Sequence, residues 1–229
     1  MIDFPSISIT HETNQFVVFP RVELITNCMS KKNGIYEVLC IVKKSSKQIC
    51  PKVFFSELST QNSYMIYRHA LNVLTTQTTS TISLNTNLNF LKSHYIEILL
   101  SEFGSTAIIL ELVETSPLDT IIQINDRLNE IKANPRVSVW LDDFGTEHAN
   151  FDLVNLVNFD AIKMSKELFW DLYENDKLLL KYLIKMIKRK ANMMVIEGVN
   201  SFDKYIFCKE QQCLMQGYFF SENEVSAVS

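Results

Sequence analysis

The chain has 229 residues, enough for one domain with a sizeable core, and its 47% hydrophobic content is ordinary for a soluble protein. The net charge of −4, without a basic stripe, argues against binding to nucleic-acid polymers as the main function. No stretch is long enough to span a bilayer and no signal peptide begins the chain, so we expect a soluble cytoplasmic protein with no membrane partner.

The cysteines and histidines do not form a metal-binding pattern. The five cysteines include no Cys-x-x-Cys pair, and the four histidines lack the spacing of a zinc motif. An odd number of thiols fits a reducing compartment, where cysteines stay free. A zinc site built from cysteine and histidine is therefore not expected.

The N-terminal part of the chain predicts a β-hairpin. Residues 16–25 and 35–42 are rich in β-branched side chains, and the Asn33-Gly34 pair between them is a strong hairpin signal. Glu37 lies inside the second stretch, on a face that is otherwise apolar. It is either a functional acid or a sign that this face of an edge strand is wet.

Beyond the hairpin, helices and strands alternate to the end of the chain. Helical spacing of apolar residues covers 53–77, 88–103, 117–133, 149–157, 166–190 and 201–210. Strand-like stretches cover 81–86, 106–113, 137–143, 159–164, 192–198 and 213–219. This alternation predicts parallel strands with crossover connections in one α/β domain over residues 1–229. About eight strands suit a closed barrel; an open doubly wound sheet is the alternative.

The stretch over residues 137–146 joins an apolar strand to two adjacent carboxylates. Side chains on a strand alternate between faces, but at the end of a strand both Asp142 and Asp143 can turn towards one cation. Divalent metals bind such clustered oxygen ligands. The same residues also fit an Asx-type turn that leaves a strand.

Comparison of the strands favours the metal site. Nearly every strand carries a residue that can bind metal or move a proton: Glu37, Asn85, Glu111 (with Glu114), Asp142, Asp143, Lys163, Glu197 and Gln216. In a barrel of parallel strands the carboxyl ends meet on one face, which holds the active site. Carboxylates and an amide make an oxygen-rich site for Mg²⁺ or Mn²⁺, and two such ions can activate water against a phosphodiester.

The order of these motifs resembles the EAL domain family, bacterial phosphodiesterases that open cyclic di-GMP to linear pGpG. The resemblance covers nearly the whole chain, from about Phe16 to Val225. Glu37-Val38-Leu39 stands where the family has Glu-Ala-Leu. The other matching segments are Leu84-Asn85, 110–116, 141–146, Ile162-Lys163-Met164, 196–199 and 216–221.

The resemblance implies a modified TIM (β/α)8 barrel with one antiparallel strand, in agreement with the hairpin. It implies two Mg²⁺ or Mn²⁺ ions and a set of roles that can be carried over to matching positions. The expected metal ligands are Glu37, Asn85, Glu111, Asp142 and Asp143. The expected catalytic residues are Glu197, Lys163 and Glu114, and the expected substrate contacts are Gln216 and Leu39.

Five positions depart from the family pattern. Phe19, Ile41, Glu147, Ser165 and Asn200 stand where the family has Gln, Arg, Gly, Asp and Glu. Glu147 predicts a displaced loop over residues 146–150 and weaker metal or substrate binding. The complete ligand set favours a cyclic-di-GMP phosphodiesterase, with activity that the departures weaken. An inactive regulator that binds cyclic di-GMP or a protein partner is the alternative, and a homodimer is also left open.

Overall fold

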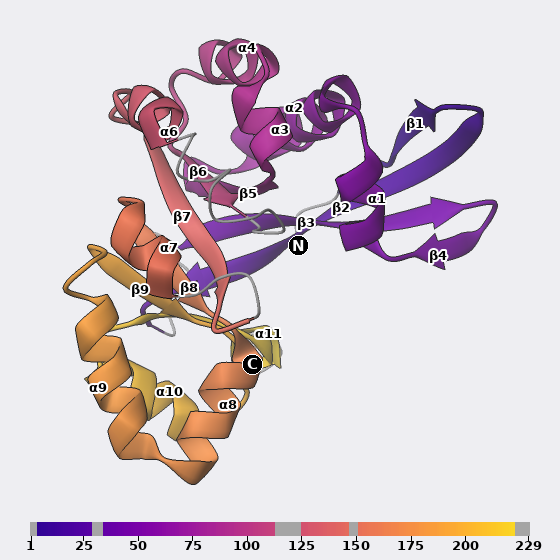
Figure 1. The fold of residues 1–229 in the computed structure, drawn as a ribbon. Coiled ribbons are helices and arrows are strands. Elements are labelled where there is room, and N and C mark those ends of the chain that lie inside the picture. The colour runs from indigo at the N-terminus through magenta and orange to yellow at the C-terminus, as the bar shows by residue number, and fades with distance from the viewer. Residues whose placement is uncertain (1–3, 29–33, 113–124, 147–150, 223–229) are drawn as a thin grey trace.

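The computed structural model describes residues 4–28, 34–112, 125–146 and 151–222 (Figure 1). The expectation that residues 1–229 form one domain stays a prediction. Within the described part, ten strands form one sheet. They are β1 (Ile7–His11), β2 (Asn14–Thr26), β3 (Ile35–Lys44), β4 (Lys47–Ile49), β5 (Thr81–Thr86), β6 (Ile108–Leu112), β7 (Val137–Phe144), β8 (Ala161–Met164), β9 (Met193–Ile196) and β10 (Leu214–Gln216).

Eight of these strands close into a barrel. Their order is β2-β10-β9-β8-β7-β6-β5-β3, and β2 also pairs with β3, which completes the ring. β2 is antiparallel to both of its barrel neighbours, whereas every other pairing in the ring is parallel. The predicted barrel with one antiparallel strand is therefore confirmed, and the open-sheet alternative is wrong. β1 and β4 extend the β2–β3 ribbon outwards beyond the ring (Figure 1).

The helices pack around the outside of the barrel (Figure 1). The described helices are α1 (Pro51–Glu57), α2 (Thr60–Gln77), α3 (Leu88–Lys92), α4 (Tyr95–Glu102), α6 (Asn125–Lys132), α7 (Phe151–Leu156), α8 (Lys166–Asn175), α9 (Lys177–Ile187), α10 (Phe202–Glu210) and α11 (Tyr218–Glu222). No helix in this described set is both long enough and apolar enough to cross a membrane.

Some predicted boundaries are wrong for local reasons. The expected helix over 53–77 is two helices, because Leu58 is extended and Ser59 starts α2 by accepting a hydrogen bond from Asn62 N. The expected helix over 88–103 breaks similarly, between α3 and α4. The edge strands β1 and β4 were not predicted, since β4 is a three-residue, largely polar strand and the alternation in β1 is limited to Ile7 and Ile9.

The last strand ends earlier than predicted. Residues 213–219 were expected to be one strand, but β10 stops at Gln216 and α11 follows. Gly217 has φ +146°, and a Cβ there would lie 2.4 Å from Val199 O. Only glycine permits this turn and this close backbone approach, so the chain leaves the sheet at once.

Strand alternation separates two apolar layers. Leu84, Leu110 and Leu141 point outwards into the core between barrel and helices. A smaller cluster fills the barrel interior: Ile25, Ile109, Trp140, Ala161 and Val195, with Ile35 and Leu214 packed against it. This apolar plug closes one end of the barrel, and the side chains that follow it on the same face line the other end.

Candidate active site

The site residues occupy the next inward-facing position after the apolar plug. Because side chains on a strand alternate, a residue two positions beyond a plug residue also faces the interior. The pairs are Ile35 and Glu37, Ile109 and Glu111, Trp140 and Asp142, Ala161 and Lys163, Val195 and Glu197, and Leu214 and Gln216. The parallel strands thus deliver these side chains to one end of the barrel.

Four carboxylates converge on the ammonium group of Lys163. The distances from Lys163 Nζ are 2.6 Å to Glu111 Oε2, 3.1 Å to Asp142 Oδ1, 3.1 Å to Glu197 Oε1 and 3.2 Å to Glu37 Oε2. Lys163 and Glu111 are fully buried, and Glu197 is the most exposed of the four acids, with 20% of its side chain accessible. Glu197 is therefore the acid that reaches furthest towards solvent.

Neutral side chains hold the carboxylates in place. Asn85 Nδ2 donates to Glu37 Oε1 at 2.6 Å, and Gln216 Nε2 donates to Glu37 Oε2 at 2.7 Å. Ser83 Oγ donates to Glu111 Oε1 at 2.5 Å. Burial by itself would raise the pKa of Glu37, but Lys163 and the two amides outweigh it and lower that pKa. Glu37 is therefore the acid that stays ionised most readily.

The cluster has more carboxylates than positive charge. Burial, followed by repulsion from Glu37, raises the pKa of Glu111 well above its usual value. Burial also raises the pKa of Asp142, and that of Glu197 to about 8. The pKa of Lys163 is raised because the carboxylates outweigh its burial, so its ammonium stays charged. The raised pKa values of Glu111, Asp142 and Glu197 thus reflect burial together with the excess of negative charge around Lys163.

Asp143 lies at a distortion at the end of β7. The register between β7 and β8 shifts between Leu141 and Phe144, and Asp143 has φ +54°. Asp tolerates this left-handed conformation better than most residues. Its charge contributes to the raised pKa of Asp142, so the two acids are close. Within the described segments, however, the Asp143 carboxylate makes no ion pair.

The donor set fits a divalent cation by its chemistry. It is rich in oxygen, it has excess negative charge, and the buried Asp142 Oδ1 has Lys163 Nζ, at 3.1 Å, as its partner among the described residues. In the part of the chain that is described, no three acidic, thiol or imidazole groups are already arranged as ligands of one ion. Lys163 instead occupies the centre of the acids, so metal binding requires this arrangement to open.

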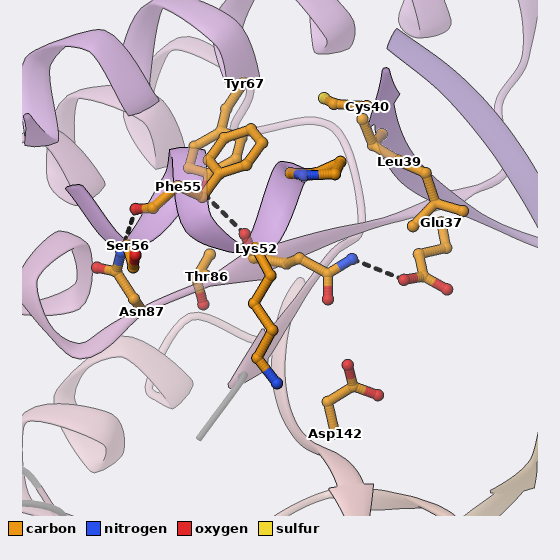
Figure 2. Close-up of a pocket in the computed structure, with 13 residues that line it drawn as sticks. Glu37, Leu39, Cys40, Lys52, Phe55, Ser56, Tyr67, Thr86, Asn87 and Asp142 are labelled. Carbon is orange, nitrogen blue, oxygen red and sulfur yellow. Dashed lines mark hydrogen bonds between the residues drawn. The ribbon is translucent and has the colours of Figure 1, made fainter. Parts of the chain in front are cut away.

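A cavity of about 270 Å³ adjoins the cluster (Figure 2). Glu37, Asn85 and Asp142 line one side of it, and Leu39 and Phe55 are among the apolar residues of its wall. Phe55 stacks on Tyr67, with ring centroids 6.4 Å apart and planes 4° apart, and Tyr67 Oη donates to Asn85 O at 2.7 Å. The aromatic wall is thus tied to the strand that carries Asn85.

Lys52 is the cationic side chain among the residues that line this cavity. It projects from α1 towards Asp142 (Figure 2). Among the described residues it makes no ion pair. The cation at the rim of the cavity can attract an anionic ligand, and the carboxylates at its floor can attract a metal ion.

The structure brings together most of the predicted site residues. Eight of the predicted positions lie at the cluster or the adjoining cavity: Leu39, Asn85, Gln216, Lys163 and the acids Glu37, Glu111, Asp142 and Glu197. Asp143 lies beside them. Glu114 and the loop residue Glu147 fall outside the described residues, so their predicted roles stay predictions.

Three residues of the site were missed in the sequence. Ser83 precedes Asn85 by two positions, so strand alternation alone could have placed it on the same face. Glu23 pairs with Glu37 across the β2–β3 ribbon, and its pKa is raised by burial and by Glu37. The predicted hairpin register could have placed Glu23 opposite Glu37. Lys52 comes from a helix, and no sequence period connects it to the strands.

Two departures from the family pattern have local explanations. Ser165 is the N-cap of α8 and accepts a hydrogen bond from Leu168 N at 3.4 Å. Ser and Asp are both preferred N-caps, so this substitution keeps the helix start. Phe19 and Ile41 face each other across the ribbon, where Lys43 lies 5.1 Å from the Phe19 ring. Two apolar side chains thus stand where the resemblance implies Gln and Arg.

Comparison with known proteins agrees with this picture. The EAL domain family model matches residues 25–223. The cyclic di-GMP phosphodiesterase NbdA of Pseudomonas aeruginosa is 30% identical over 130 residues, 53% of this chain and 16% of that protein. The cyclic di-GMP phosphodiesterase TpdA of Vibrio parahaemolyticus is 25% identical over 208 residues, 87% of this chain and 36% of that protein. The chain spans well under half the length of either relative.

The fold is also shared with solved structures. The Bacillus subtilis YkuI protein, with an EAL domain, in complex with substrate c-di-GMP and calcium, matches with a TM-score of 0.69. The identity is 17%, and the match covers 88% of this chain and 54% of that one. At this identity the likeness concerns the fold alone. Because the family model matches most of the sequence, the chain belongs to the EAL domain family.

Proposed function

We propose that the protein hydrolyses cyclic di-GMP to linear pGpG with the help of Mg²⁺ or Mn²⁺. The observation that carries the proposal is the ring of four carboxylates around Lys163, beside a cavity that also contains Lys52. Family membership and the names of the two relatives support the substrate class. We expect a product with one phosphodiester bond opened.

Five residues would hold the metal ions: Glu37, Asn85, Glu111, Asp142 and Asp143. The excess of carboxylate over cation around Lys163 supports this set. Two bound ions would supply Lewis acidity and lower the pKa of a bound water. A divalent charge among the acids would also favour their ionised forms, so metal binding releases the protons that the metal-free site holds.

We assign the proton acceptor to Glu197. It is the most exposed of the four acids, and its carboxylate already lies at the open side of the cluster. Burial raises the pKa of Glu197, and a bound divalent cation would favour the ionised carboxylate, which can take a proton from water. Lys163 keeps its own proton, so its role is that of a fixed positive charge that positions Glu197 and the other acids.

We assign substrate contacts to the cavity wall. Lys52 can reach a phosphate from the rim, and Phe55 offers a flat surface on which a guanine ring can stack. A cavity of about 270 Å³ is at the small end for ligand sites. It therefore suits one nucleotide half, in contact with Leu39, and the second half would lie across the barrel mouth near Gln216.

Purified protein incubated with cyclic di-GMP and either Mn²⁺ or Mg²⁺ tests the proposal. Chromatography should resolve linear pGpG that forms with time and does not form in the presence of a chelator. If the protein binds cyclic di-GMP but does not hydrolyse it under any metal condition, the proposed enzyme activity is wrong and the protein is a regulator that senses cyclic di-GMP. If the protein neither binds nor hydrolyses cyclic di-GMP, the proposed function is wrong and binding of a protein partner becomes the function to test.

A further inference from the structure

Helix α9 presents a second apolar face to solvent. Its inward side is buried through Leu180, Ile184 and Ile187. On the outward side, Leu178 and Tyr182 are each 63% exposed, Leu179 is 51% exposed and Met186 is 45% exposed. Positions separated by four residues lie on one side of a helix, so Leu178, Tyr182 and Met186 form a continuous crest. Scattered exposed leucines are ordinary, whereas a contiguous apolar crest marks an interaction site.

Positive charges lie beside this crest. Lys177, Lys181 and Lys185 belong to α9, and Lys188, Arg189 and Lys190 follow directly; together they are six of the 22 basic residues of an acidic protein. No acidic residue occurs between positions 177 and 196. Among the described residues none of these six cations forms an ion pair. No carboxylate of the described part neutralises their charge, and Lys185, Arg189 and Lys190 are exposed to solvent, whereas Lys177 and Lys181 lie over the rings of Tyr173 and Phe207.

A surface depression lies next to the crest, between α9 and the end of α10. It encloses about 640 Å³, and its lining includes Lys181, Lys185, Lys188 and Arg189 on the α9 side. Glu210, Gln211 and Gln212 close the opposite side. Lys188 Nζ donates to the carbonyl oxygens of Gln211 and Gln212, at 3.0 and 2.9 Å, which fixes this wall. The depression can accept a phosphate group from the side on which the crest is exposed.

We propose that this α9 face, formed by the crest and its flanking cations, binds the surface of an anionic lipid membrane. The helix lies flat, Leu178, Tyr182 and Met186 enter the boundary between headgroups and acyl chains, and the cations contact lipid phosphates. Leu178 and Tyr182 of the crest also line the depression, together with Lys185 and Arg189, so apolar and cationic side chains face the same partner surface. A fluid lipid surface adapts to such a crest, and polybasic flanks add attraction to anionic headgroups.

This mode of binding differs from a membrane span. The expectation that the protein has no membrane partner considered only stretches long enough to cross a bilayer. A short helix that rests on the surface needs one apolar face and adjacent cations, which α9 has on its solvent side. The proposal does not depend on hydrolytic activity, because no residue of the α9 face belongs to the barrel mouth.

Sedimentation with lipid vesicles tests the proposal. One set of vesicles contains phosphatidylcholine alone, and the other an equimolar mixture of phosphatidylcholine and phosphatidylglycerol. We expect the wild type to sediment with the mixed vesicles only, and less as salt rises. The double variant Lys185→Glu, Arg189→Glu should lose at least about tenfold in binding. The variant Leu178→Gln, Tyr182→Gln should lose binding while its charge is unchanged.

A matched control reverses two exposed cations elsewhere, Lys47→Glu and Lys92→Glu, so that the net charge changes equally. It should bind vesicles like the wild type, and thermal unfolding should be alike for all variants. Equal loss in the control, or no wild-type binding to anionic vesicles, overturns the proposal. A heavier species in size-exclusion chromatography that depends on Leu178 and Tyr182, without vesicle binding, would assign the face to a second copy of the chain and also overturn it.

Discussion

The lysine at the centre of the barrel and the lysines of α9 show two opposite uses of the same side chain. Lys163 is 1% exposed and contacts four carboxylates, whereas Lys185 and its neighbours are in solvent and form no ion pair with described residues. A buried charge is tolerated only when it is compensated, so Lys163 and its acids depend on one another. Surface cations carry no such constraint and are free to serve binding.

Replacement of the two kinds of lysine should give the largest contrast. Lys163→Met leaves buried carboxylates without their cation, and we expect the free energy of unfolding to fall by about 3–5 kcal/mol. Lys185→Met should change it by less than about 0.5 kcal/mol. Urea denaturation of metal-free protein measures both. Equal effects of the two substitutions would contradict the proposed dependence of the acids on Lys163.

Substitution of an acid should affect the free energy of unfolding in the opposite way to substitution of Lys163. Asp142→Asn removes one charge from a cluster with excess negative charge, so stability should be kept or should rise. Hydrolysis should fall by at least about a hundredfold, because a shared metal ligand is lost. Steady-state rates with Mn²⁺, together with urea denaturation, separate the two effects. Normal turnover by this variant would rule out the proposed metal site.

The raised pKa of Glu197 predicts how the stability of the metal-free protein depends on pH. Its pKa rises from 4.5 in the free acid to about 8 in the fold, so the folded state binds more protons between these values. The free energy of unfolding therefore falls as pH rises through this window. Glu111 and Asp142 act in the same direction, and Glu37 acts in the opposite one.

Thermal unfolding in the presence of a chelator, measured from about pH 5.5 to about pH 8.5, checks this dependence. Glu197→Gln should make the decline shallower, because the titrating group is gone. The matched substitution Glu167→Gln, on the exposed surface of α8, should leave it unchanged. A decline that is identical in wild type and Glu197→Gln would show that other groups cause it.

Lys52 lies between the two extremes, exposed but directed towards the site (Figure 2). Lys52→Met should raise KM for cyclic di-GMP about five- to tenfold, because an exposed contact to a charged phosphate is lost. The value of kcat should change little. Lys47→Met, on the distant β4 edge, is the control and should leave KM unchanged. An unaltered KM in Lys52→Met would remove Lys52 from the substrate site.

The smallest effect concerns Ser165, beside the site but outside its charges. Ser165→Ala removes the N-cap of α8 and should lower the free energy of unfolding by about 1 kcal/mol. Ser165→Asp restores a capping side chain and should stay within a few tenths of the wild type. Chemical denaturation measures both. A large loss of hydrolysis in Ser165→Asp would contradict the structural role.

The sequence predicted the barrel because strands and helices alternate along it, and most of the cluster because the carboxyl ends of parallel strands meet on one face. Glu111, Asp142 and Lys163 each lie two positions beyond a residue of the apolar plug, so one rule places them all. Lys52 was not predicted as a site residue because its position depends on how α1 packs across β3, and no sequence period encodes that packing. The early end of β10 was not predicted because it depends on the contact between Gly217 and Val199, which are far apart in the local sequence.

The pairing of β2 with β10 has a consequence for folding. Ile25 and Thr26 pair with Gln216 and Met215, almost at opposite ends of the sequence. Contacts between such distant residues form late, because a long loop must close first. During synthesis the ring therefore stays open until β10 has left the ribosome. Until then β2 and β9 expose unpaired edges, and Glu37 lacks its bond from Gln216. The acid pocket is completed by the last strand to emerge.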